Sequence, residues 1–575
     1  MRQLMILEVS QKQAYIFEST KLKENVERSE EICRVTDPAY FELAAKQSSL
    51  AFDKEKNVVY SGGGHTVLEF PDRESAEKFA YAISSRVRRE YPELEYFIKT
   101  MEYDESKGAG ENLFRLSQEL EKKKSVRAAS FHQGSFGVEE KDSNLRRAKV
   151  ITGRVDKIEM PAEHEYVPEG YVMPYKLEEL GVSKDDSSFV AIVHIDGNGM
   201  GKRVENLRTK CKDLSWEEYK KTLRSFSDAI DADFKTAFRG MLDEIGEQIP
   251  ALVDAGLNLK NRSFPVRKLI LAGDDVCFVT EGRIGLEAAR IFIEKLSALE
   301  NAVDHQKYTA CAGVAIVHQK YPFYKAYELS EMLCSNAKRF LAYYDDRIKD
   351  SGTKGCAIDW HIEFGEIIDD LAEMRQKYET EDGGTLELRP YMLCAEPELW
   401  KLEKVRRYRS FKKLLSMLLD KKEVYARGKI KELRGVLKEG EKATEYYLQS
   451  SLMDILNLDI FEDHKLEEQL RQIGTGSGLE RRAFLDIDGK KQSLYLTSRL
   501  IMRQQKLSTS WKRCQKRNLM RLLKYTSDSV WTPDMLTSRS EALSCSRMEP
   551  VRRRRFSYLR RAIKRRKLKK PAQIM

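Results

Sequence analysis

The sequence predicts an α/β protein of the α+β type, in which one βαββαβ unit occurs twice and a helical region follows. Three observations support this prediction. Apolar strand patterns at residues 4–9 and 189–195 each open a segment that runs through helix into a tight hairpin. Both hairpin turns contain glycine, a typical turn residue. Helical periodicity then dominates residues 366–472. The repeated order is the ferredoxin-like layout and indicates an internal duplication.

The first predicted domain covers residues 1–105. After the strand at 4–9, residues 22–46 have helical periodicity that breaks near Asp37-Pro38. A break is expected there because proline lacks an N–H group and disfavours helical geometry in the preceding residue. The remaining predicted elements are strands at 58–60 and 67–70, a helix at 73–90 and a strand at 94–101.

The second predicted domain covers residues 188–365 and repeats the plan at larger scale. Residues 189–195 are almost wholly apolar, which is typical of a central buried strand. The remaining predicted elements are a helix at 215–248, strands at 269–271 and 276–279, a helix at 284–303, a strand at 309–317, a helix at 326–344 and a strand at 356–361.

Three further regions complete the predicted organisation. Residues 106–187 form a helical connector, with a helix at 115–124 and three prolines between residues 160 and 174. Residues 366–472 form a helical domain, including helices at 409–421 and 445–457. Residues 473–575 form a basic tail that we expect to be disordered.

The net charge of +10 comes from that tail. Residues 490–575 hold 25 Lys and Arg residues against four acidic ones, which leaves the other 489 residues with a net charge of −11. Nucleic-acid binding by the whole chain therefore does not follow from its overall charge. The arginine run at 552–555 could bind nucleic acid electrostatically. A disordered extension or a shifted reading frame explains the abrupt composition at least as well, and we assign the tail no function.

The cysteine pattern and the hydropathy indicate the compartment. Nine cysteines are scattered singly and no C-x-x-C motif occurs, so neither a zinc ribbon nor a disulfide framework is expected. No run of about 18 apolar residues occurs, and the apolar stretch at the N-terminus is too short for a signal peptide. We expect a cytoplasmic protein without a membrane span.

Two segments, at residues 194–202 and 271–276, combine carboxylates with glycines. Asp196 ends a buried strand, and Asp274 and Asp275 lie in a hairpin turn. If the hairpin pairs beside the lead strand, three carboxylates converge, and cations must neutralise their repulsion. Oxygen ligands suit two Mg²⁺ or Mn²⁺ ions, which would activate a 3′-hydroxyl and steady a leaving pyrophosphate. Either motif alone is a common turn, but together they indicate a nucleotidyl-transfer or cyclase domain.

The glycines of the first segment provide a candidate phosphate site, because they let backbone N–H groups approach a phosphate chain closely. A helix N-terminus just beyond them would add a favourable dipole. The candidate nucleotide-binding residues here are Gly197, Asn198, Gly199, Met200, Gly201 and Lys202, with Arg203 as a further basic candidate.

The hairpin turn at 273–275 resembles the GGDD motif of the large, polymerase-like subunit of type III CRISPR effector complexes, with Ala272 in place of the first glycine. Other segments that resemble motifs of that subunit lie at 7–17, 60–65, 194–202, 313–338 and 358–361. The resemblance implies two ferredoxin-like palm domains of the polymerase and nucleotidyl cyclase type. The family's His-Asp nuclease domain and cysteine zinc module are not recognisable, so we expect a shortened or stand-alone relative.

The resemblance also implies different roles for the two hairpins. The first has Gly62 and Gly63 where the second has Gly273 and acidic residues, so the first palm is expected to be catalytically silent. It could still supply part of a second nucleotide pocket. Ser61 and His65 flank this hairpin and are candidates to touch a base or ribose. Lys338 is a candidate triphosphate ligand, with a solvated helix lysine as the alternative. Glu8 is expected to be structural, and His194 to be a packed core residue or a support for the metal site.

The resemblance implies the condensation of ATP into cyclic or linear oligoadenylate second messengers in antiviral defence. The implied partners are CRISPR-type effector subunits, guide or target RNA, and a downstream effector that senses the cyclic nucleotide. Three alternatives stay open: a cyclase that uses another nucleotide such as GTP, a non-enzymatic scaffold of an RNA-guided complex, and a template-dependent polymerase. The acidic body of the chain disfavours the polymerase.

Overall fold

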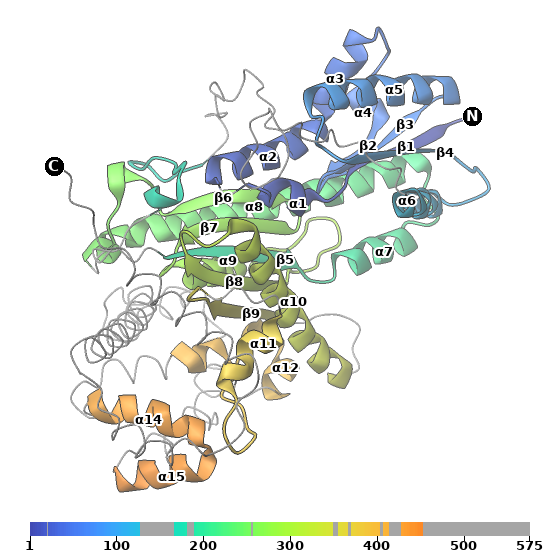
Figure 1. Cartoon of the computed structure of the whole chain (residues 1–575). Coiled ribbons are helices and arrows are strands. Elements are labelled where there is room, and N and C mark those ends of the chain that lie inside the picture. Colours follow the sequence, from blue (N-terminus) through green and yellow to red (C-terminus); the bar gives the residue numbers. More distant parts are fainter. Residues whose placement is uncertain are drawn as a thin grey trace, which may run out of the picture. The chain divides into compact units, whose positions relative to one another are not determined.

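Two β-sheets organise the described part of the chain (Figure 1). The computed structural model describes residues 1–19, 21–126, 166–180, 189–254, 257–348, 355–365, 370–402, 406–412 and 427–451, which all fall within the unit Met1–Gln504. The predicted mixed α/β fold with two sheets is confirmed. The predicted tail at 473–575, most of the connector at 106–187 and most of the predicted helix at 409–421 lie outside these ranges.

The first domain has a four-stranded antiparallel sheet with the strand order β2-β3-β1-β4. This is the order of a ferredoxin-like sheet, as the predicted βαββαβ plan requires. The strands are β1 (Gln3–Val9), β2 (Val58–Gly62), β3 (His65–Phe70) and β4 (Tyr96–Glu102). The helices are α1 (Lys12–Phe17), α2 (Leu22–Val35), α3 (Pro38–Gln47), α4 (Lys54–Asn57), α5 (Arg73–Glu90) and α6 (Ala109–Ser125).

Capping residues set the helix boundaries in this domain. The predicted break at Asp37-Pro38 separates α2 from α3: the Asp37 side chain accepts a hydrogen bond of 2.7 Å from the backbone N–H of Ala39, and Pro38 occupies the first helical position. Asp72 caps α5 in the same way, through the N–H of Ser75 at 2.8 Å. These short polar side chains satisfy N–H groups that the helix itself leaves without acceptors.

The second domain has a six-stranded sheet with the order β10-β9-β8-β5-β7-β6. Its strands are β5 (Phe189–Gly197), β6 (Val266–Ala272), β7 (Asp275–Glu281), β8 (Ala310–His318), β9 (Gly355–Ile362) and β10 (Tyr391–Ala395). Its helices are α7 (Met200–Lys210), α8 (Trp216–Asp254), α9 (Gly285–Ser297) and α10 (Phe323–Ile348). The part β8-β5-β7-β6 repeats the order of the first sheet, so the predicted duplication is visible in the topology.

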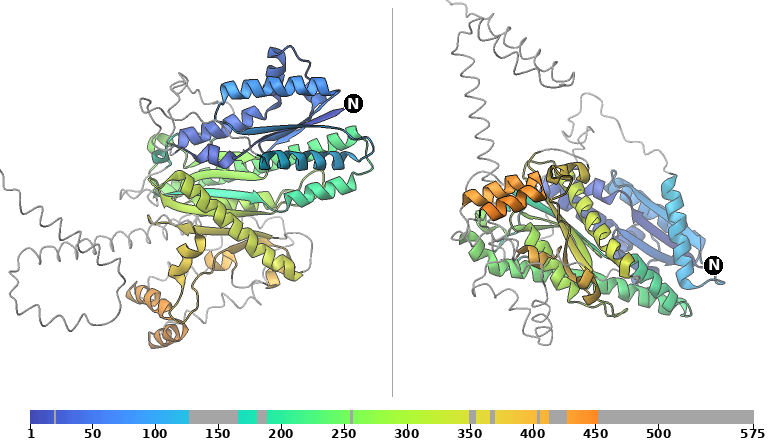
Figure 2. Two further views of the ribbon diagram at one scale, coloured as in Figure 1. Left: turned by 45° about the vertical axis from the view of Figure 1, so that its right-hand side comes forward. Right: turned by 90° about the horizontal axis from the view of Figure 1, so that it is seen from below.

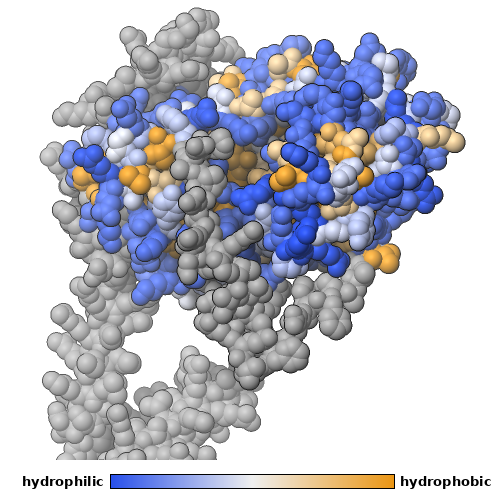
Figure 3. All heavy atoms as spheres, turned by 90° about the horizontal axis from the view of Figure 1, so that it is seen from above, coloured by the Kyte–Doolittle hydropathy of each residue, from blue (hydrophilic) through white to orange (hydrophobic). Residues whose placement is uncertain are grey.

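Short elements follow the second sheet and complete the described chain. After β10 come α12 (Pro397–Leu402), α14 (Arg427–Glu439) and α15 (Glu441–Ser450), while α11 (Leu371–Arg375) and the 3₁₀ turn η3 (Gln376–Tyr378) lie between β9 and β10. Two further 3₁₀ turns lie earlier in the chain: η1 (Leu177–Glu179) precedes β5, and η2 (Lys260–Arg262) lies between α8 and β6. Seen from the first domain in Figure 3, the surface is mainly hydrophilic, with apolar residues in small separate groups. Among the described helices, none has both the length and the apolarity to cross a bilayer.

Two strands extend the second sheet beyond the ferredoxin-like core. Helix α10 connects β8 to β9, which lies parallel to β8, and β10 then pairs antiparallel with β9. Gly313 on β8 lets α10 lie close to the sheet, because a Cβ atom there would stand only 1.9 Å from the carbonyl oxygen of Ser330. Any larger residue would push the helix away from the strand.

Helix α8 packs against both domains (Figures 1 and 2). Its first half buries Trp216, Tyr219, Leu223 and Phe226 with the first sheet's Leu4 and Ile6. Its second half buries side chains of the second domain's core, namely Phe234, Phe238, Met241 and Ile245. Polar bonds add to the first contact, since Lys220 donates to a carboxylate oxygen of Glu69 at 2.8 Å. At 39 residues, α8 spans roughly 58 Å, enough to cover two sheets.

Two predicted boundaries are wrong. Helix α6 was assigned to a connector after residue 105, but its Leu116 and Leu120 are buried in the core beneath the first sheet. The region 366–472 was predicted to be helical, but β10 within it is a strand of the second sheet. Strand β10 is short and helix α6 is amphipathic. The sequence pattern of such a segment does not show which domain it joins, because that depends on the residues it packs against, which are distant in sequence.

We expect Leu223→Ala to lower the free energy of unfolding by about 2–5 kcal/mol, because it opens a cavity where α8 meets the first sheet. Lys221→Ala, on the exposed side of the same helix, is the matched control and should change stability little. Urea denaturation of both variants measures the difference. Equal stability of the two variants would contradict the packing role of α8.

Candidate active site

Strand pairing brings the three predicted acidic residues to one end of the second sheet. Asp196 on β5 lies directly opposite Asp275 on β7. Ala272 pairs with Asp275, so Gly273 and Asp274 form a two-residue turn between β6 and β7. Gly273 has φ of 64°, which favours glycine. The carbonyl of Asp274 accepts a hydrogen bond of 3.1 Å from the N–H of Gly197, which ties the turn to the end of β5.

This arrangement raises the pKa of two of the carboxyl groups. Burial is the main cause, and the negative charge of Asp196 adds to it, so the pKa of Asp274 rises to about 6 and that of Asp275 to about 7. The Oδ1 atom of Asp275 is buried and has no hydrogen-bond partner among the described residues. His194 Nδ1 is 3.6 Å away, beyond hydrogen-bonding distance. An uncompensated carboxylate of this kind favours a cation.

Lys338 supplies one positive charge to the acidic cluster. Its Nζ lies 2.5 Å from Oδ2 of Asp196. Burial opposes the charged lysine, but the hydrogen bond and the charge of Asp196 prevail and raise the pKa of Lys338. Lys338, a predicted triphosphate ligand, therefore points into the site and pairs with Asp196, a predicted metal ligand.

Lys12 of the first domain also faces this site, and sequence reasoning missed it. It begins α1, and its ammonium donates a hydrogen bond to the carbonyl of Gly63 in the first hairpin. Its charge lowers the pKa of Asp275, against the larger effects of burial and Asp196. The one signal in the sequence is position: Lys12 follows β1 as Lys202 follows β5.

The glycine loop after β5 is partly open and partly packed. Gly199 caps α7 with φ of 68°, and Cβ atoms at Gly199 or Gly201 would meet nothing within 4 Å. In contrast, a Cβ atom at Gly197 would lie 2.9 Å from Cβ of Asp274, so this glycine allows the hairpin turn to approach the loop. Asn198 is buried, and its side chain donates to the carbonyl of Gly355 at 3.2 Å. The open backbone is therefore at residues 199–201.

The two basic candidates after the loop differ in environment. Lys202 is exposed in the first turn of α7. Arg203 is buried and makes a bidentate contact with Asp304, at 2.6 and 2.7 Å, while its guanidinium lies 4.7 Å from the ring centroid of Tyr308. This arginine is held within the domain by Asp304, an arrangement that disfavours a role as a nucleotide ligand.

The first hairpin presents backbone and few polar side-chain groups. Gly63 has φ of 60°, and a Cβ atom at Gly62 would lie 3.5 Å from the hydroxyl of Ser227 on α8. The Ser61 hydroxyl donates to the carbonyl of Thr36 at 2.7 Å, so this side chain is engaged within the first domain. Burial and the charge of Lys12 lower the pKa of His65.

Two other predicted structural residues are packed. Glu8 forms an ion pair of 2.7 Å with Lys124 on α6, as its predicted structural role requires. His194 is buried, its ring packs edge-on against Tyr327 with centroids 5.7 Å apart, and burial lowers its pKa. Tyr327 in turn stacks on Phe17 of the first domain at 3.9 Å. The core beside the acidic cluster is thus shared by both domains.

The donor set fits a hard divalent cation, although it is not assembled as a metal site. Across the described ranges, no three His, Cys, Asp or Glu side chains already stand in a geometry that would hold a metal ion. The three carboxylates nevertheless offer oxygen ligands of the kind that Mg²⁺ and Mn²⁺ prefer. The buried, unpartnered oxygen of Asp275 supports such a site. A cation on Asp196 would have to compete with Lys338.

The comparison with known protein families agrees with this geometry. Residues 189–343 match the family model of the Cas10/Cmr2 second palm domain. This segment is similar to a Cas10-type second palm domain. The match includes the acidic cluster, the glycine loop and Lys338, so the recognition of this palm from the sequence is confirmed. None of the curated proteins compared matches the chain.

Solved Cas10-type structures are similar to the chain at low identity. The apo Csm1-Csm4 cassette has 15% identity and a TM-score of 0.45, and the match covers 78% of this chain and 65% of that one. The cassette in complex with cA4 has 16% identity, coverage of 87% and 69%, and a TM-score of 0.49. Csm1 of T.onnurineus has 16% identity, coverage of 81% and 66%, and a TM-score of 0.44. The chain thus spans about two thirds of the length of these structures.

In the metal-free palm, ionisation of Asp275 should destabilise the fold as pH rises. The pKa of Asp275 in the folded protein lies above its value in the unfolded chain. The protonated carboxyl therefore contributes fully to folding stability below about pH 4, and this contribution is lost as pH rises through about 7. Asp275→Asn does not titrate, so in EDTA its stability advantage over the native protein should grow between pH 5 and pH 8. About a third of the side chain is exposed, so screening should limit the gain to about 1–2 kcal/mol.

Thermal melting across this pH range measures the difference. Asp213→Asn, at an exposed position outside the cluster, is the control and should show no pH-dependent advantage. A constant gap between Asp275→Asn and the native protein would show that Asp275 does not titrate in this range.

Proposed function

We propose that the chain is a metal-dependent nucleotidyltransferase of the cyclase type, which condenses ATP into cyclic or linear oligoadenylate. The observation that carries the proposal is the direct pairing of Asp196 with Asp275, next to Asp274, inside a Cas10-type palm. In the proposed reaction, a ribose 3′-oxygen forms a bond to the α-phosphorus of a second ATP, and the bond to the pyrophosphate group breaks. The hydroxyl proton is released and pyrophosphate leaves.

The proposed roles follow the geometry. Asp196, Asp274 and Asp275 would hold two Mg²⁺ or Mn²⁺ ions, which when bound activate the hydroxyl and stabilise the leaving group. Backbone N–H groups of residues 199–201, at the N-terminus of α7, bind the triphosphate. Lys338 exchanges its partner, from Asp196 to a phosphate oxygen. Lys12 adds a positive charge from the first domain.

The biological setting is part of the proposal. Csm1-Csm4 cassettes have been solved with one ATP, with pppApA and with cA4. For this chain we propose the same substrate class, with CRISPR-type effector subunits and guide or target RNA as partners, and a cyclic-nucleotide-sensing effector downstream. A cyclase that uses GTP is the nearest alternative, because palm chemistry does not fix the base.

A non-enzymatic scaffold is the competing function. The ion pair between Lys338 and Asp196 is the observation that favours it, since a lysine can neutralise a carboxylate permanently and make a metal unnecessary. Metal binding therefore distinguishes the two functions. If the chain is an enzyme, Asp196 would bind Mn²⁺ and Lys338 would give up its contact with that carboxylate. If the chain is a scaffold, the contact between Lys338 and Asp196 would persist in Mn²⁺.

The decisive experiment incubates the full chain with each labelled nucleoside triphosphate and Mn²⁺, and identifies the products by mass. Asp274→Ala combined with Asp275→Ala should reduce ATP turnover to below about 1% of the native value, because the metal ligands are lost. Glu217→Ala with Glu218→Ala removes two adjacent exposed acids elsewhere and should keep activity. Native-level turnover in the Asp274, Asp275 double variant would refute the catalytic assignment.

A second prediction concerns the division of roles between the hairpins. Gly63 has positive φ, so Gly63→Val should strain the turn by about 1–3 kcal/mol and weaken binding of a non-hydrolysable ATP analogue. Metal binding at the acidic cluster should persist, because the first hairpin carries no carboxylate. Gly62→Ala is the matched control, since φ there is not positive and its Cβ meets Ser227 at an ordinary 3.5 Å.

Isothermal titration with Mn²⁺, with and without the analogue, separates the two effects. Loss of Mn²⁺ binding in folded Gly63→Val would show that metal binding also needs the first hairpin, which contradicts the proposed separation of nucleotide binding from metal binding.

A further inference from the structure

A second polar cavity lies beside α10, outside the acidic cluster. Its volume is about 680 Å³, within the range of about 300–1,000 Å³ that is typical of ligand sites. Three arginines and three aromatic residues define its chemistry: Arg339, Arg389, Arg406, Phe340, Tyr343 and Tyr344. None of the three catalytic aspartates lines it.

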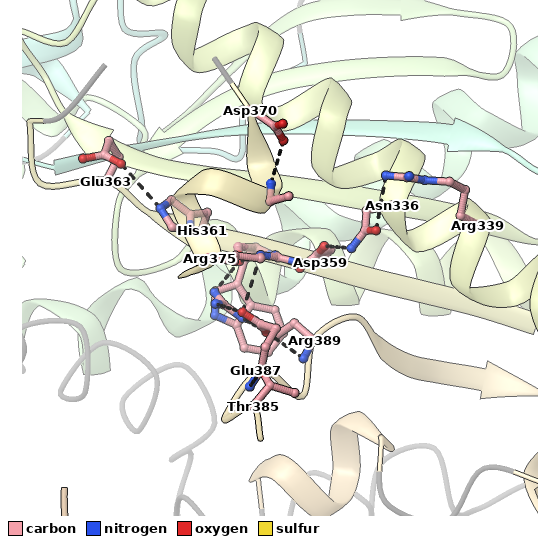
Figure 4. Close-up of polar contacts among 12 residues, drawn as sticks. Asn336, Arg339, Asp359, His361, Glu363, Asp370, Arg375, Thr385, Glu387 and Arg389 are labelled. Carbon is pink, nitrogen blue, oxygen red and sulfur yellow. Dashed lines mark hydrogen bonds and ion pairs between the residues drawn. The ribbon is translucent and has the colours of Figure 1, made fainter. Parts of the chain in front are cut away.

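The two nearby carboxylates are both engaged in ion pairs, one of them with a lining arginine. Asp359 accepts from Asn336 at 2.7 Å and from Arg375 at 2.6 Å (Figure 4). Glu387 accepts from Arg389 at 2.7 and 2.8 Å. No carboxylate is among the described residues that line the cavity. The described lining therefore holds three guanidinium groups, and Glu387 offsets the charge of one of them, Arg389.

Two of the arginines that line the cavity have N–H donors that no described contact uses. Arg389 uses three of its five N–H donors within the described part of the chain, on Glu387 and on the carbonyl of Trp360. Arg339 is exposed, and its one described contact is a long bond of 3.4 Å to Asn336 (Figure 4). Guanidinium groups with spare donors are well suited to phosphate oxygens.

The aromatic residues form a connected surface beside these arginines. Phe340 packs edge-on against Tyr344 and Tyr344 against Tyr343, in both cases with centroids 5.2 Å apart. Arg406 lies over Phe340 at 5.7 Å from the ring centroid. Phe340 and Tyr344 are buried, whereas the Tyr343 side chain is 52% exposed. The exposed ring of Tyr343, which packs against the buried ring of Tyr344, offers a flat surface on which a planar group can stack.

We infer that this cavity binds a nucleotide unit, with its phosphate on Arg339 and Arg389 and its base against Tyr343. Stacking on aromatic rings combined with arginine contacts to phosphate is the chemistry by which proteins hold bases of single-stranded nucleic acids. The unit is either a free mononucleotide or one residue of a single strand, because both present the same groups. The inference does not depend on the proposed catalytic function.

The test uses the full chain in EDTA, which removes metal-dependent binding at the acidic cluster. One probe is 8-azidoadenosine monophosphate, and the other is a ten-nucleotide single-stranded RNA with one 4-thiouridine. Photocrosslinking followed by peptide mass spectrometry locates each probe, and fluorescence-detected titration of labelled forms gives the affinities. We expect crosslinks within residues 339–344.

Arg339→Glu and Tyr343→Ala should each weaken binding about tenfold, which corresponds to about 1.4 kcal/mol. Both side chains are exposed, so the variants should melt like the native protein. Tyr343→Phe keeps the ring and should bind like the native chain. Arg88→Glu, at an exposed position on α5, makes the same charge change elsewhere and should alter binding less than about twofold.

Each outcome decides the question. Weaker binding of both probes supports a site for a single nucleotide, and weaker binding of the RNA alone supports a site for a strand. Unchanged affinities of both variants for both probes, or crosslinks only outside residues 339–344, would overturn the inference.

Discussion

Helix α8 is buried in two hydrophobic cores at once. This shared helix determines that residues of both domains meet at the acidic cluster. Its first half packs on the first sheet through Leu223 and Phe226, and its second half on the second sheet through Phe238 and Ile245. Because one rigid helix is common to both, the sheets cannot move independently without exposing apolar surface. The stacked pair Phe17 and Tyr327 fixes the domains at a second point. Lys12 thereby acts on Asp275 at the start of β7, although it is more than 200 residues from it in sequence.

Charge balance at the acidic cluster follows from that placement. Three carboxylates at one sheet end would repel one another if alone. Burial is the main cause of the raised pKa values of Asp274 and Asp275, and the negative charge of Asp196 adds to it. One compensating lysine comes from each domain: Lys338 contacts Asp196 directly, and Lys12 acts on Asp275 from α1. The first domain thus contributes a positive charge to the acidic cluster of the second. A single copy of the fold would lack this lysine.

Local patterns predicted most of the fold. The break at Asp37-Pro38, the apolar strand β5 and the turn at Gly273 depend on short-range chemistry, and the structure has all three. The convergence of the acidic residues followed from strand pairing alone. What could not be predicted depends on distant partners. Arg203 looked equivalent to Lys202, but successive helical residues point about 100° apart, and its partner Asp304 lies 101 positions away. Strand β10 is five residues long and gains its identity only by pairing with β9.

The two strands that follow α10 move the open edge of the second sheet away from β5. In a bare ferredoxin-like sheet, β8 would be an edge strand, directly beside β5, which carries Asp196. With β9 and β10 in place, the outer boundary lies three strands from β5. Two paired strands, β9 and β8, therefore stand between the open edge at β10 and the paired strands β5 and β7 that carry the acidic cluster. A local distortion at that edge would have to pass through both strands before it altered the register between β5 and β7.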